Sequence, residues 1–402
     1  MIAHPTLRAS IRTLPRPAWV LFAGTFVNRF GSFLAVYLVL FMVHRGYSPA
    51  QAGLALGAAG LGAIAANAIG GSLADRFSRR GTIALSMISS AALTMLVPFA
   101  PNFPSILALV GMVGVAASLY RPAAGAILAD VTTDEQRVAA FGINRFFVNT
   151  GFALGPAVAG FLAERSYVLL FAGDALTSLV FGAVAVFVLP ETKPSEVSEQ
   201  RPGQGWADVL RDTPFMFVLA GFVLGALVYA QSNSTFSLEI AARGLPASAY
   251  GLLISLNGLM IILFELPLIS VTQRLPARPV MAAGLLVTGA GFALTALAPT
   301  LPLLAATVAV WTLGEMLAAP VGGAYSARIA PAHLRARYQA AWGIPWSVGA
   351  AAGPVLGSLL YIRGAPLLWG TCGALGAVGA ALVMAGRPAR RNTPAGAGVP
   401  GG

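Results

Sequence analysis

The sequence is poor in the residues from which metal centres, disulfides and most catalytic sites are built. It has one cysteine, Cys372, among its 402 residues, which excludes an internal disulfide and a cysteine metal cluster. The three histidines, His4, His44 and His333, are scattered and lie near the expected helix ends, which argues against a zinc site. We find no Ser/His/Asp or phosphate-cradling constellation and no ATP-binding motif. We therefore predict no enzyme, no metal, no cofactor and no ATP-driven pump.

Charge is scarce as well. Charged residues make up 10% of the chain, whereas a soluble domain carries about 25%. Hydrophobic residues make up 57% and the mean hydropathy is +0.78, more apolar surface than a soluble chain of this size could bury. A helix that spans a bilayer needs about 20 mostly apolar residues. Twelve such runs predict an all-α integral membrane protein with twelve transmembrane helices, at residues 18–43, 49–74, 81–100, 104–130, 138–163, 167–190, 214–242, 247–272, 279–298, 302–329, 337–361 and 366–386.

The positive charge is distributed loop by loop along the chain. Of the 25 Lys and Arg residues, eighteen fall in segments that the helix count places on one side of the membrane, and four fall in loops on the other side. Cytoplasmic loops carry the excess of Lys and Arg, so we predict that both termini are cytoplasmic. The net charge of +11 is not gathered on one face, which argues against a nucleic-acid partner.

One long polar connection divides the chain near its middle. Residues 191–213 read ETKPSEVSEQRPGQGWADVLRDT and predict a cytoplasmic linker between two six-helix bundles. The expected organisation is a cytoplasmic N-terminal segment at 1–17, a first bundle at 18–190, this linker at 191–213, a second bundle at 214–386 and a disordered cytoplasmic tail at 387–402.

The two bundles are related in sequence. A shift of 198 residues aligns nine features without a gap: Arg45-Gly46 with Arg243-Gly244, Arg76 with Arg274, Arg80 with Arg278, Pro101 with Pro299, Pro104 with Pro302, Pro122 with Pro320, Arg137 with Arg335, Gly155-Pro156 with Gly353-Pro354, and Arg165 with Arg363. An even number of spans in each half makes this a parallel repeat with a pseudo-twofold axis. In transporters built this way, the seam between the halves holds the substrate near the bilayer midplane.

A charged hinge follows the second run, where Gly70 to Gly81 read GGSLADRFSRRG. The stretch GSLADRFSRRGT resembles the signature of the loop between helices 2 and 3 in the major facilitator superfamily. Ser78 stands where that signature usually has glycine. The residues that match are Gly71, Leu73, Asp75, Arg76, Arg79 and Arg80. With the twelve-helix repeat, this resemblance covers essentially the whole chain and implies that superfamily's fold.

The fifth run gives a second resemblance. NTGFALGPAVAGF is similar to the motif of the twelve-helix drug:proton antiporters through Gly151, Gly155, Pro156 and Gly160. This implies export. The chain departs from that branch in its fourth run. Depending on how the glycines are aligned, Leu107 or Val110 stands where the branch usually has an arginine. Arg121 comes at least eleven residues after that place.

The resemblance implies a conformational gate at the hinge. Asp75 should face the positive N-terminal end of the eleventh helix, and Arg79 should reach Asp130. We place Arg145 with this cluster too, because it is close to the cytoplasmic end of the fifth run. The gate comprises Gly71, Asp75, Arg76, Arg79, Arg80, Asp130 and Arg145. The alternative is that these charges only set the topology of the loop.

Ionisable residues inside the runs are candidates for binding protons or substrate, because a charge at the bilayer centre is costly. Glu315, in WTLGEMLAAP, is the first proton candidate, and Glu265, in LFELPL, is the second. Glu315 could instead form a structural ion pair with Arg29 or Arg121. The full set of candidates is Glu315, Glu265, Arg29, Asn28, Asp174 and Arg121.

Two roles remain open for Arg29. It could bind an anionic substrate group or act as a fixed counter-charge for Glu315 or Glu265. Polar and aromatic residues that could line a cavity are Tyr37, Asn67, Asn149, Gln231, Asn233, Asn257, Trp311, Trp342 and Trp346.

The sequence therefore predicts a secondary transporter that exchanges a small amphipathic compound, outward, against protons. We expect a monomer in the bacterial inner membrane whose partners are the small molecule, protons and the lipid bilayer. The alternatives are uptake of a nutrient or anion with protons, with Arg29 as the binding residue, and a lipid flippase. A receptor or scaffold that does not transport is disfavoured, because the charges inside the spans would then be a cost without a use.

Overall fold

The computed structural model describes residues 13–76, 78–191, 206–331 and 334–386. Within these ranges, the side chains that lie outside the description are those of residues 67, 68, 70–72, 74–76, 134, 135, 138 and 336. The described residues include twelve helices or helix pairs that are long and apolar enough to cross a membrane. The twelve spans expected from the sequence are therefore all present.

The described residues of the first half form eight α-helices and one short 3-10 turn. They are α2 (Arg16–Phe30), α3 (Phe33–His44), α4 (Pro49–Arg76), α5 (Arg79–Leu96), η1 (Val97–Phe99), α6 (Phe103–Ala116), α7 (Tyr120–Val131), α8 (Asp134–Arg165) and α9 (Tyr167–Phe187). The second half contains α10 (Trp206–Arg211), α11 (Thr213–Tyr229), η2 (Ala230–Asn233), α12 (Thr235–Ala242), α13 (Ala247–Thr272), α14 (Ala277–Leu294), η3 (Thr295–Leu297), α15 (Leu301–Ile329), α16 (Arg335–Tyr361) and α17 (Ala365–Ala385).

The internal repeat is visible in the helix boundaries. The pairs α5 and α14, η1 and η3, and α9 and α17 begin and end 198 residues apart, and α4 and α13 begin 198 residues apart. The loops repeat as well, because Gly46 (φ 84°) and Gly244 (φ 70°) both adopt the left-handed conformation that glycine tolerates best. The parallel repeat predicted from sequence is therefore present in the backbone.

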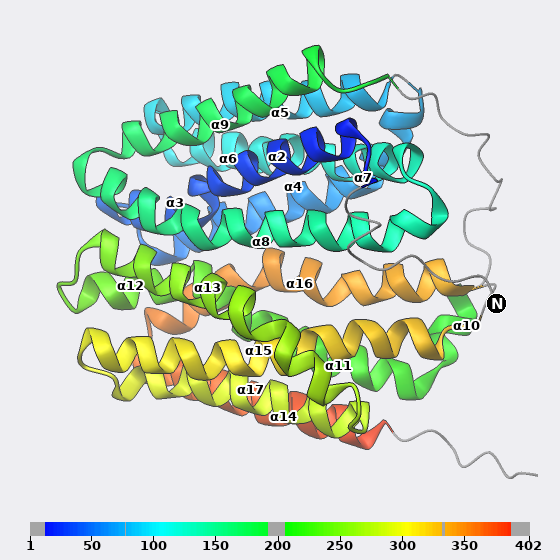
Figure 1. The fold of residues 1–402 in the computed structure, drawn as a ribbon. Helices are drawn as coiled ribbons and strands as arrows, with labels where there is room; N and C mark the ends of the chain where they lie inside the picture. Colours follow the sequence, from blue (N-terminus) through cyan, green and yellow to red (C-terminus); the bar gives the residue numbers. More distant parts are fainter. Residues whose placement is uncertain (1–12, 77, 192–205, 332–333, 387–402) are drawn as a thin grey trace, which may run out of the picture.

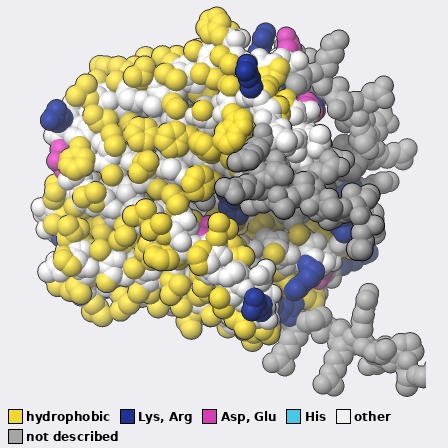
Figure 2. Space-filling model, in the orientation of Figure 1, with side chains coloured by type: hydrophobic (Ala, Val, Ile, Leu, Met, Phe, Trp, Pro, Cys, Tyr) yellow, Lys and Arg dark blue, Asp and Glu magenta, His cyan; other side chains and the backbone are white. Residues whose placement is uncertain are grey.

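The two halves lie side by side, as Figure 1 shows with the first half above the second. Their contact runs along two pairs of long helices: α8 packs along α13, and α4 packs along α16. In the text below, the end of the bundle where α4 gives way to α5 is the motif end, and the end where α3 gives way to α4 is the opposite end. Hydrophobic side chains cover most of the face shown in Figure 2, while the Lys and Arg side chains visible there lie mainly towards the ends.

Three spans that the sequence predicts as continuous helices are broken. The first breaks at Gly31 and Ser32, between α2 and α3, and the seventh passes through η2 between α11 and α12. The fourth breaks between α6 and α7, at residues 117–119, and Pro122 follows in the first turn of α7, where its ring would clash with a carbonyl of a continuous helix. Ser86 stabilises that break, because its hydroxyl accepts a hydrogen bond from the Tyr120 N–H at 3.1 Å. Breaks in the first span of each half are typical of transporter binding sites.

At the opposite end the halves are in backbone contact. A Cβ added to Gly53 would lie 2.5 Å from the Pro354 carbonyl oxygen, and one added to Gly60 would lie 2.5 Å from the Ala350 carbonyl oxygen. Such approach is possible only where one partner has no side chain. Small residues therefore hold α4 against α16 here.

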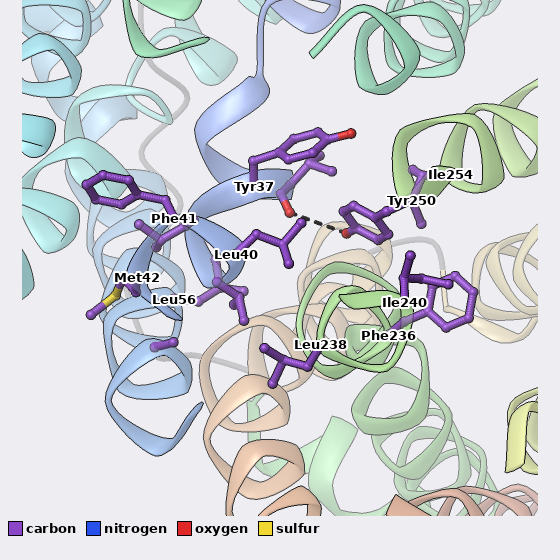
Figure 3. Close-up of a cluster of buried hydrophobic side chains, with 14 of the residues drawn as sticks. Tyr37, Leu40, Phe41, Met42, Leu56, Phe236, Leu238, Ile240, Tyr250 and Ile254 are labelled. Atoms are coloured by element: carbon purple, nitrogen blue, oxygen red, sulfur yellow. Dashed lines mark hydrogen bonds between the residues drawn. The ribbon is translucent and has the colours of Figure 1, made fainter. Parts of the chain in front are cut away.

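Two tyrosines complete the contact at this end. The Tyr37 hydroxyl donates to the Pro156 carbonyl at 2.9 Å and lies 3.2 Å from the Ala247 carbonyl. The Tyr250 hydroxyl donates to the Ser232 carbonyl at 2.9 Å and lies 3.3 Å from the Val36 carbonyl. Figure 3 shows the two rings within a cluster of buried apolar side chains from both halves. The opposite end is therefore closed to solutes.

The motif end is looser. A Cβ added to Gly142 on α8 or to Gly343 on α16 would meet no atom within 4 Å. Both glycines belong to the helix pairs that are in tight contact further along the bundle. The helix surfaces at these two positions are therefore open, in contrast to the backbone contacts at the opposite end.

Two glycines on α8 give a matched test of this packing. Gly155→Ala should lower the free energy of unfolding by about 1–3 kcal/mol, because the added methyl overlaps the Phe30 carbonyl oxygen. Gly142→Ala should leave stability unchanged or raise it by about 0.5–1 kcal/mol, since alanine is the better helix former and the space is open. Thermal midpoints of the purified protein in detergent measure both changes. Equal midpoints for the two variants would contradict the packing described here.

Candidate functional site

A cavity of about 400 Å³ lies between the halves, midway along the bundle. Its first-half wall is mixed and carries the charged side chains of the lining: beside the apolar residues and glycines of α3, α4 and α6 stand Asn28, Arg29, Ser32, Ser90, Thr94, Ser118, Arg121, Asp174 and Ser178. Its second-half wall is mostly apolar and aromatic, with Ala226, Tyr229, Ala230, Asn233, Trp346, Gly349, Ala350 and Pro354. The volume is in the range of small-molecule sites.

The two arginines in this cavity come from the broken spans of the first half. Arg29 lies in the last turn of α2, next to the break at Gly31, and Arg121 lies in the first turn of α7. Arg29 is half-buried and Arg121 is exposed to the cavity. Each guanidinium lies within the electrostatic reach of the other. The sequence left Arg121 open between gate and cavity, and the structure places it in the cavity.

Asp174 also lines the cavity, but its carboxylate is already engaged. The break between α2 and α3 leaves the first N–H groups of α3 without partners inside the helix. The Asp174 carboxylate accepts a hydrogen bond from one of them, that of Leu34, at 2.9 Å. Asp174 therefore caps α3 from the neighbouring helix α9, a structural role that the sequence did not predict.

Asn28 supports the same wall of the cavity. Its side-chain amide is buried and donates to the Ser178 hydroxyl at 3.5 Å and to the Met87 sulfur at 3.3 Å. These contacts tie α2 to α5 and α9 directly below Arg29. Asn28 thus helps to fix the last turn of α2, from which Arg29 projects.

A second, smaller pocket of about 70 Å³ lies between the halves and holds the two proton candidates. Its lining consists of Arg145, Asn149, Ile261, Glu265, Glu315, Met316, Ala319 and Pro320, from α8, α13 and α15. The cavity and this pocket are thus separate, and the acids are in the pocket rather than beside Arg29 and Arg121.

Arg145 forms an ion pair with Glu265 across the two halves. The Arg145 Nη2 atom lies 2.6 Å from Glu265 Oε1, with 62% of the arginine side chain and 12% of the glutamate side chain exposed. We placed Arg145 with the gate residues on sequence grounds, and that placement is wrong. Residue 145 lies three turns into α8, on the face that packs along α13, so its guanidinium reaches the carboxylate in the other half.

Glu315 is held by hydrogen bonds. The Asn257 side-chain amide donates to Glu315 Oε2 at 2.9 Å and also contacts the Thr312 hydroxyl at 3.1 Å. The Tyr229 hydroxyl is also close enough to the carboxylate to act on it. The alternative of a structural ion pair with Arg29 or Arg121 is therefore not realised. Arg145 and Glu265 are instead the charges that act on Glu315.

Tyr229 connects the cavity with the pocket, and the sequence analysis missed it. Its ring lines the cavity and packs edge-on against Trp346, with ring centroids 6.0 Å apart, while its hydroxyl contacts Glu315. The signal available in the sequence was its place directly before the polar stretch AQSN that breaks the seventh span.

At the motif end the structure confirms one contact of the gate. Arg79, which is buried, pairs with Asp130 and donates to the Ala126 carbonyl at 3.4 Å. Both partners belong to the first half, so this pair fastens the loop to α7 and does not itself join the halves. Arg80 lies 3.5 Å from Glu191, a partly exposed pair. The side chains of Gly71, Asp75 and Arg76 lie outside the described part of the structure.

The four residues of the α8 motif serve close helix packing. A Cβ at Gly151 would lie 2.7 Å from the Phe26 carbonyl oxygen, and Gly155 lies against Phe30, both on α2. Gly160 faces the other half, where an added Cβ would lie 2.6 Å from the Ser248 Cα. The Pro156 carbonyl accepts the Tyr37 hydrogen bond. The motif thus packs α8 against both α2 and α13.

The remaining cavity candidates separate into lining and structural residues. Asn233 and Trp346 line the cavity, and Asn149 lines the pocket. Gln231 lies at the break of the seventh span and ties it to α16, because its side-chain amide donates to the Gly353 carbonyl at 3.0 Å. Trp311 is buried in the core, and Trp342 packs on Phe222. The side chain of Asn67 is outside the description.

Comparison with known proteins agrees with this architecture. The sequence profile of the Major Facilitator Superfamily matches residues 21–246 and, a second time, residues 231–400. A Na(+), Li(+), K(+)/H(+) antiporter of Planococcus maritimus is 25% identical over 389 residues, which cover 84% of this chain and 90% of that protein. The quinolone resistance protein NorA of Staphylococcus aureus (strain MRSA252) is 30% identical over 179 residues, 43% of this chain and 46% of its own. A mutant of the nucleoside transporter NupG shares the fold, with a TM-score of 0.79 and 17% identity over 92% of this chain and 100% of that one.

Substitutions of Asp174 can distinguish a role in the stability of the fold from a role of its charge in transport. Asp174→Ala should lower the free energy of unfolding by about 0.5–2 kcal/mol, because the buried Leu34 N–H at the start of α3 loses its acceptor. Asp174→Asn should retain most of the stability and the transport rate, since an asparagine oxygen also accepts from helix N–H groups. Thermal midpoints and transport rates of both variants test this. A fully stable Asp174→Asn variant without transport would show that the charge of Asp174 is required.

Proposed function

Because the chain belongs to the Major Facilitator Superfamily, whose members are transporters and not enzymes, we propose that it exchanges a small amphipathic compound against protons by alternating access. The observation that carries this proposal is the set of three charges in the small pocket between the halves. Two carboxylates, Glu265 and Glu315, face one guanidinium, that of Arg145. The set lacks one positive charge.

A proton supplies that missing charge. Two acids that share one cation in a poorly hydrated place repel each other, and binding of one proton relieves the repulsion. Arg145 belongs to the first half, and both acids belong to the second. Protonation at this pocket therefore changes the attraction between the halves, which is the requirement for coupling a proton to alternating access.

Tyr229 provides the link to the transported compound. A compound in the cavity contacts the Tyr229 ring, and the same residue holds the Glu315 carboxylate. A compound that packs against the ring keeps the Tyr229 hydroxyl close to Glu315, which stabilises the ionised carboxylate and disfavours the proton, as exchange of the compound against a proton requires. Binding in the cavity and protonation in the pocket then influence each other, as linked sites must.

This arrangement replaces the arginine that drug:proton antiporters usually carry early in the fourth span. At the two positions considered, Val110 is buried in the apolar core and Leu107 packs against it. Proton coupling is therefore assigned to the second half of the chain. The two relatives support exchange and export: one is named as a cation/H(+) antiporter and the other as a quinolone resistance protein.

Replacing Glu315 tests the proposed coupling. Proteoliposomes that contain a pH-sensitive dye should show proton movement when cationic, neutral or anionic amphipathic solutes are added outside. Glu315→Gln should reduce that movement at least about tenfold, because the amide binds no proton at neutral pH. The matched control is Glu191→Gln, an acid 57% exposed at the motif end, which should leave it unchanged. Wild-type proton movement in Glu315→Gln would exclude this residue, and solute flux without any proton movement would indicate a uniporter or a flippase.

The ion pair between the halves gives a second test. Arg145→Glu should abolish exchange, because three acids would then meet in one pocket. The double variant Arg145→Glu with Glu265→Arg restores an opposite-charge pair in reversed orientation and should recover a measurable part of the rate. Exchange assays on the single and double variants check this. A double variant as inactive as the single one, with normal thermal stability of both, would count against a role for the pair itself.

A further inference from the structure

We propose that the central cavity takes an organic anion, with its acidic group held between Arg29 and Arg121 and its apolar body against Tyr229 and Trp346. The inference rests on the proposed transport function and names the class of compound. It starts from the charges of the cavity lining. Arg29 and Arg121 are the basic residues of that lining, and Asp174 is its one acid among the described residues.

The two guanidinium groups have no carboxylate partner. Among the described residues, no Asp or Glu oxygen lies within 4.0 Å of either arginine. The Asp174 carboxylate is held by the α3 backbone. The Nε atom of Arg29 is buried and has no hydrogen-bond partner. A donor left in this state costs free energy that an acceptor on a ligand would recover.

The repeat shows that the fold does not require these arginines. The residues 198 positions later are Leu227 and Ala319, in helices that adopt the same architecture. Two neighbouring cations within the membrane are costly on their own. Their alternative use, as counter-charges for Glu265 and Glu315, is ruled out by the contacts of those acids with Arg145, Asn257 and Tyr229.

The two walls of the cavity determine the rest of the compound. The same lining contains the hydroxyl groups of Ser90, Thr94 and Ser118, which suit the oxygens of a carboxylate, sulfonate or phosphate. Across the cavity, the aromatic rings of Tyr229 and Trp346 meet edge to face and are flanked by small apolar residues. The volume of about 400 Å³ admits a compound with one or two rings. An amphipathic acid fits both walls, whereas an amphipathic cation would meet the arginines.

A matched series of naphthalene derivatives tests the charge preference. Purified full-length protein in detergent is titrated with 2-naphthoate, 2-naphthalenesulfonate, 2-naphthamide and 2-naphthylmethylammonium, and binding is followed by thermal shift and by tryptophan fluorescence. The two anions should bind at least about tenfold more tightly than the amide, and the ammonium compound should bind more weakly still. Equal or tighter binding of the ammonium compound would overturn the anion site. This comparison uses the wild-type protein and does not depend on the folding of a variant.

Substitutions then locate the site. Arg121→Gln and Arg29→Gln should each weaken binding of 2-naphthoate roughly tenfold or more, and Arg29→Lys should retain part of it, because it keeps the charge but not the planar donor geometry. The control is Arg363→Gln, at the opposite end and away from the cavity. Undiminished binding of 2-naphthoate to both glutamine variants would refute the assignment.

The anion site and proton exchange can fail separately. If 2-naphthoate binds with these dependences but moves no protons in proteoliposomes, the anion site stands and proton coupling is wrong. If the ammonium compound or the amide drives proton movement that depends on Glu315, while 2-naphthoate neither binds nor moves protons, exchange stands and the anion site is refuted.

Discussion

A charge inside a bilayer is costly unless it meets an opposite charge, a hydrogen-bond partner or water, and this constraint explains where the polar groups of this protein lie. The Asp174 carboxylate accepts a hydrogen bond from the first turn of α3, and Arg145 forms an ion pair with Glu265. The Glu315 carboxylate accepts a hydrogen bond from Asn257 and lies close to the Tyr229 hydroxyl. Among the described residues, Arg29 and Arg121 have no carboxylate partner, and both line the cavity. The charges that the protein does not neutralise itself are thus the ones that face a space large enough for a ligand.

The repeat separates what the fold needs from what the function needs. Helix boundaries, the left-handed Gly46 and Gly244 and the short turns η1 and η3 recur 198 residues apart, so they belong to the architecture. The charged residues of the cavity and the pocket do not recur, although several loop arginines do: Cys372 corresponds to Asp174, Ala117 to Glu315, and Gly343 to Arg145. In the account proposed here, the first half has specialised in binding the compound and the second in binding the proton.

Much of this architecture follows from the sequence, because long apolar runs and a gapless repeat determine the number, order and pairing of the helices. The Arg79–Asp130 pair was also predictable, from the resemblance of the loop motif to that of the superfamily. Two features of the structure could not be predicted from the sequence. The sequence could not show that the first and seventh spans break, because apolar composition alone does not distinguish a broken helix from a continuous one. The capping role of Asp174 and the position of Tyr229 both depend on these breaks, so neither could be predicted from the sequence. The placement of Arg145 depends on which face of α8 meets α13, and a single residue in a long helix does not specify that.

The central claim is that protonation of the pocket changes how the two halves sit against each other, and a distance measurement at the motif end tests it most directly. Gly142 and Gly343 lie in open space on α8 and α16, one in each half, so cysteines there can carry spin labels once the buried Cys372 is replaced by serine. The account predicts that the distance distribution between the labels shifts between acidic and alkaline pH, and that the shift is lost when Glu265 and Glu315 are both replaced by glutamine. A distribution that does not change with pH, or a shift that persists without the two acids, would contradict it.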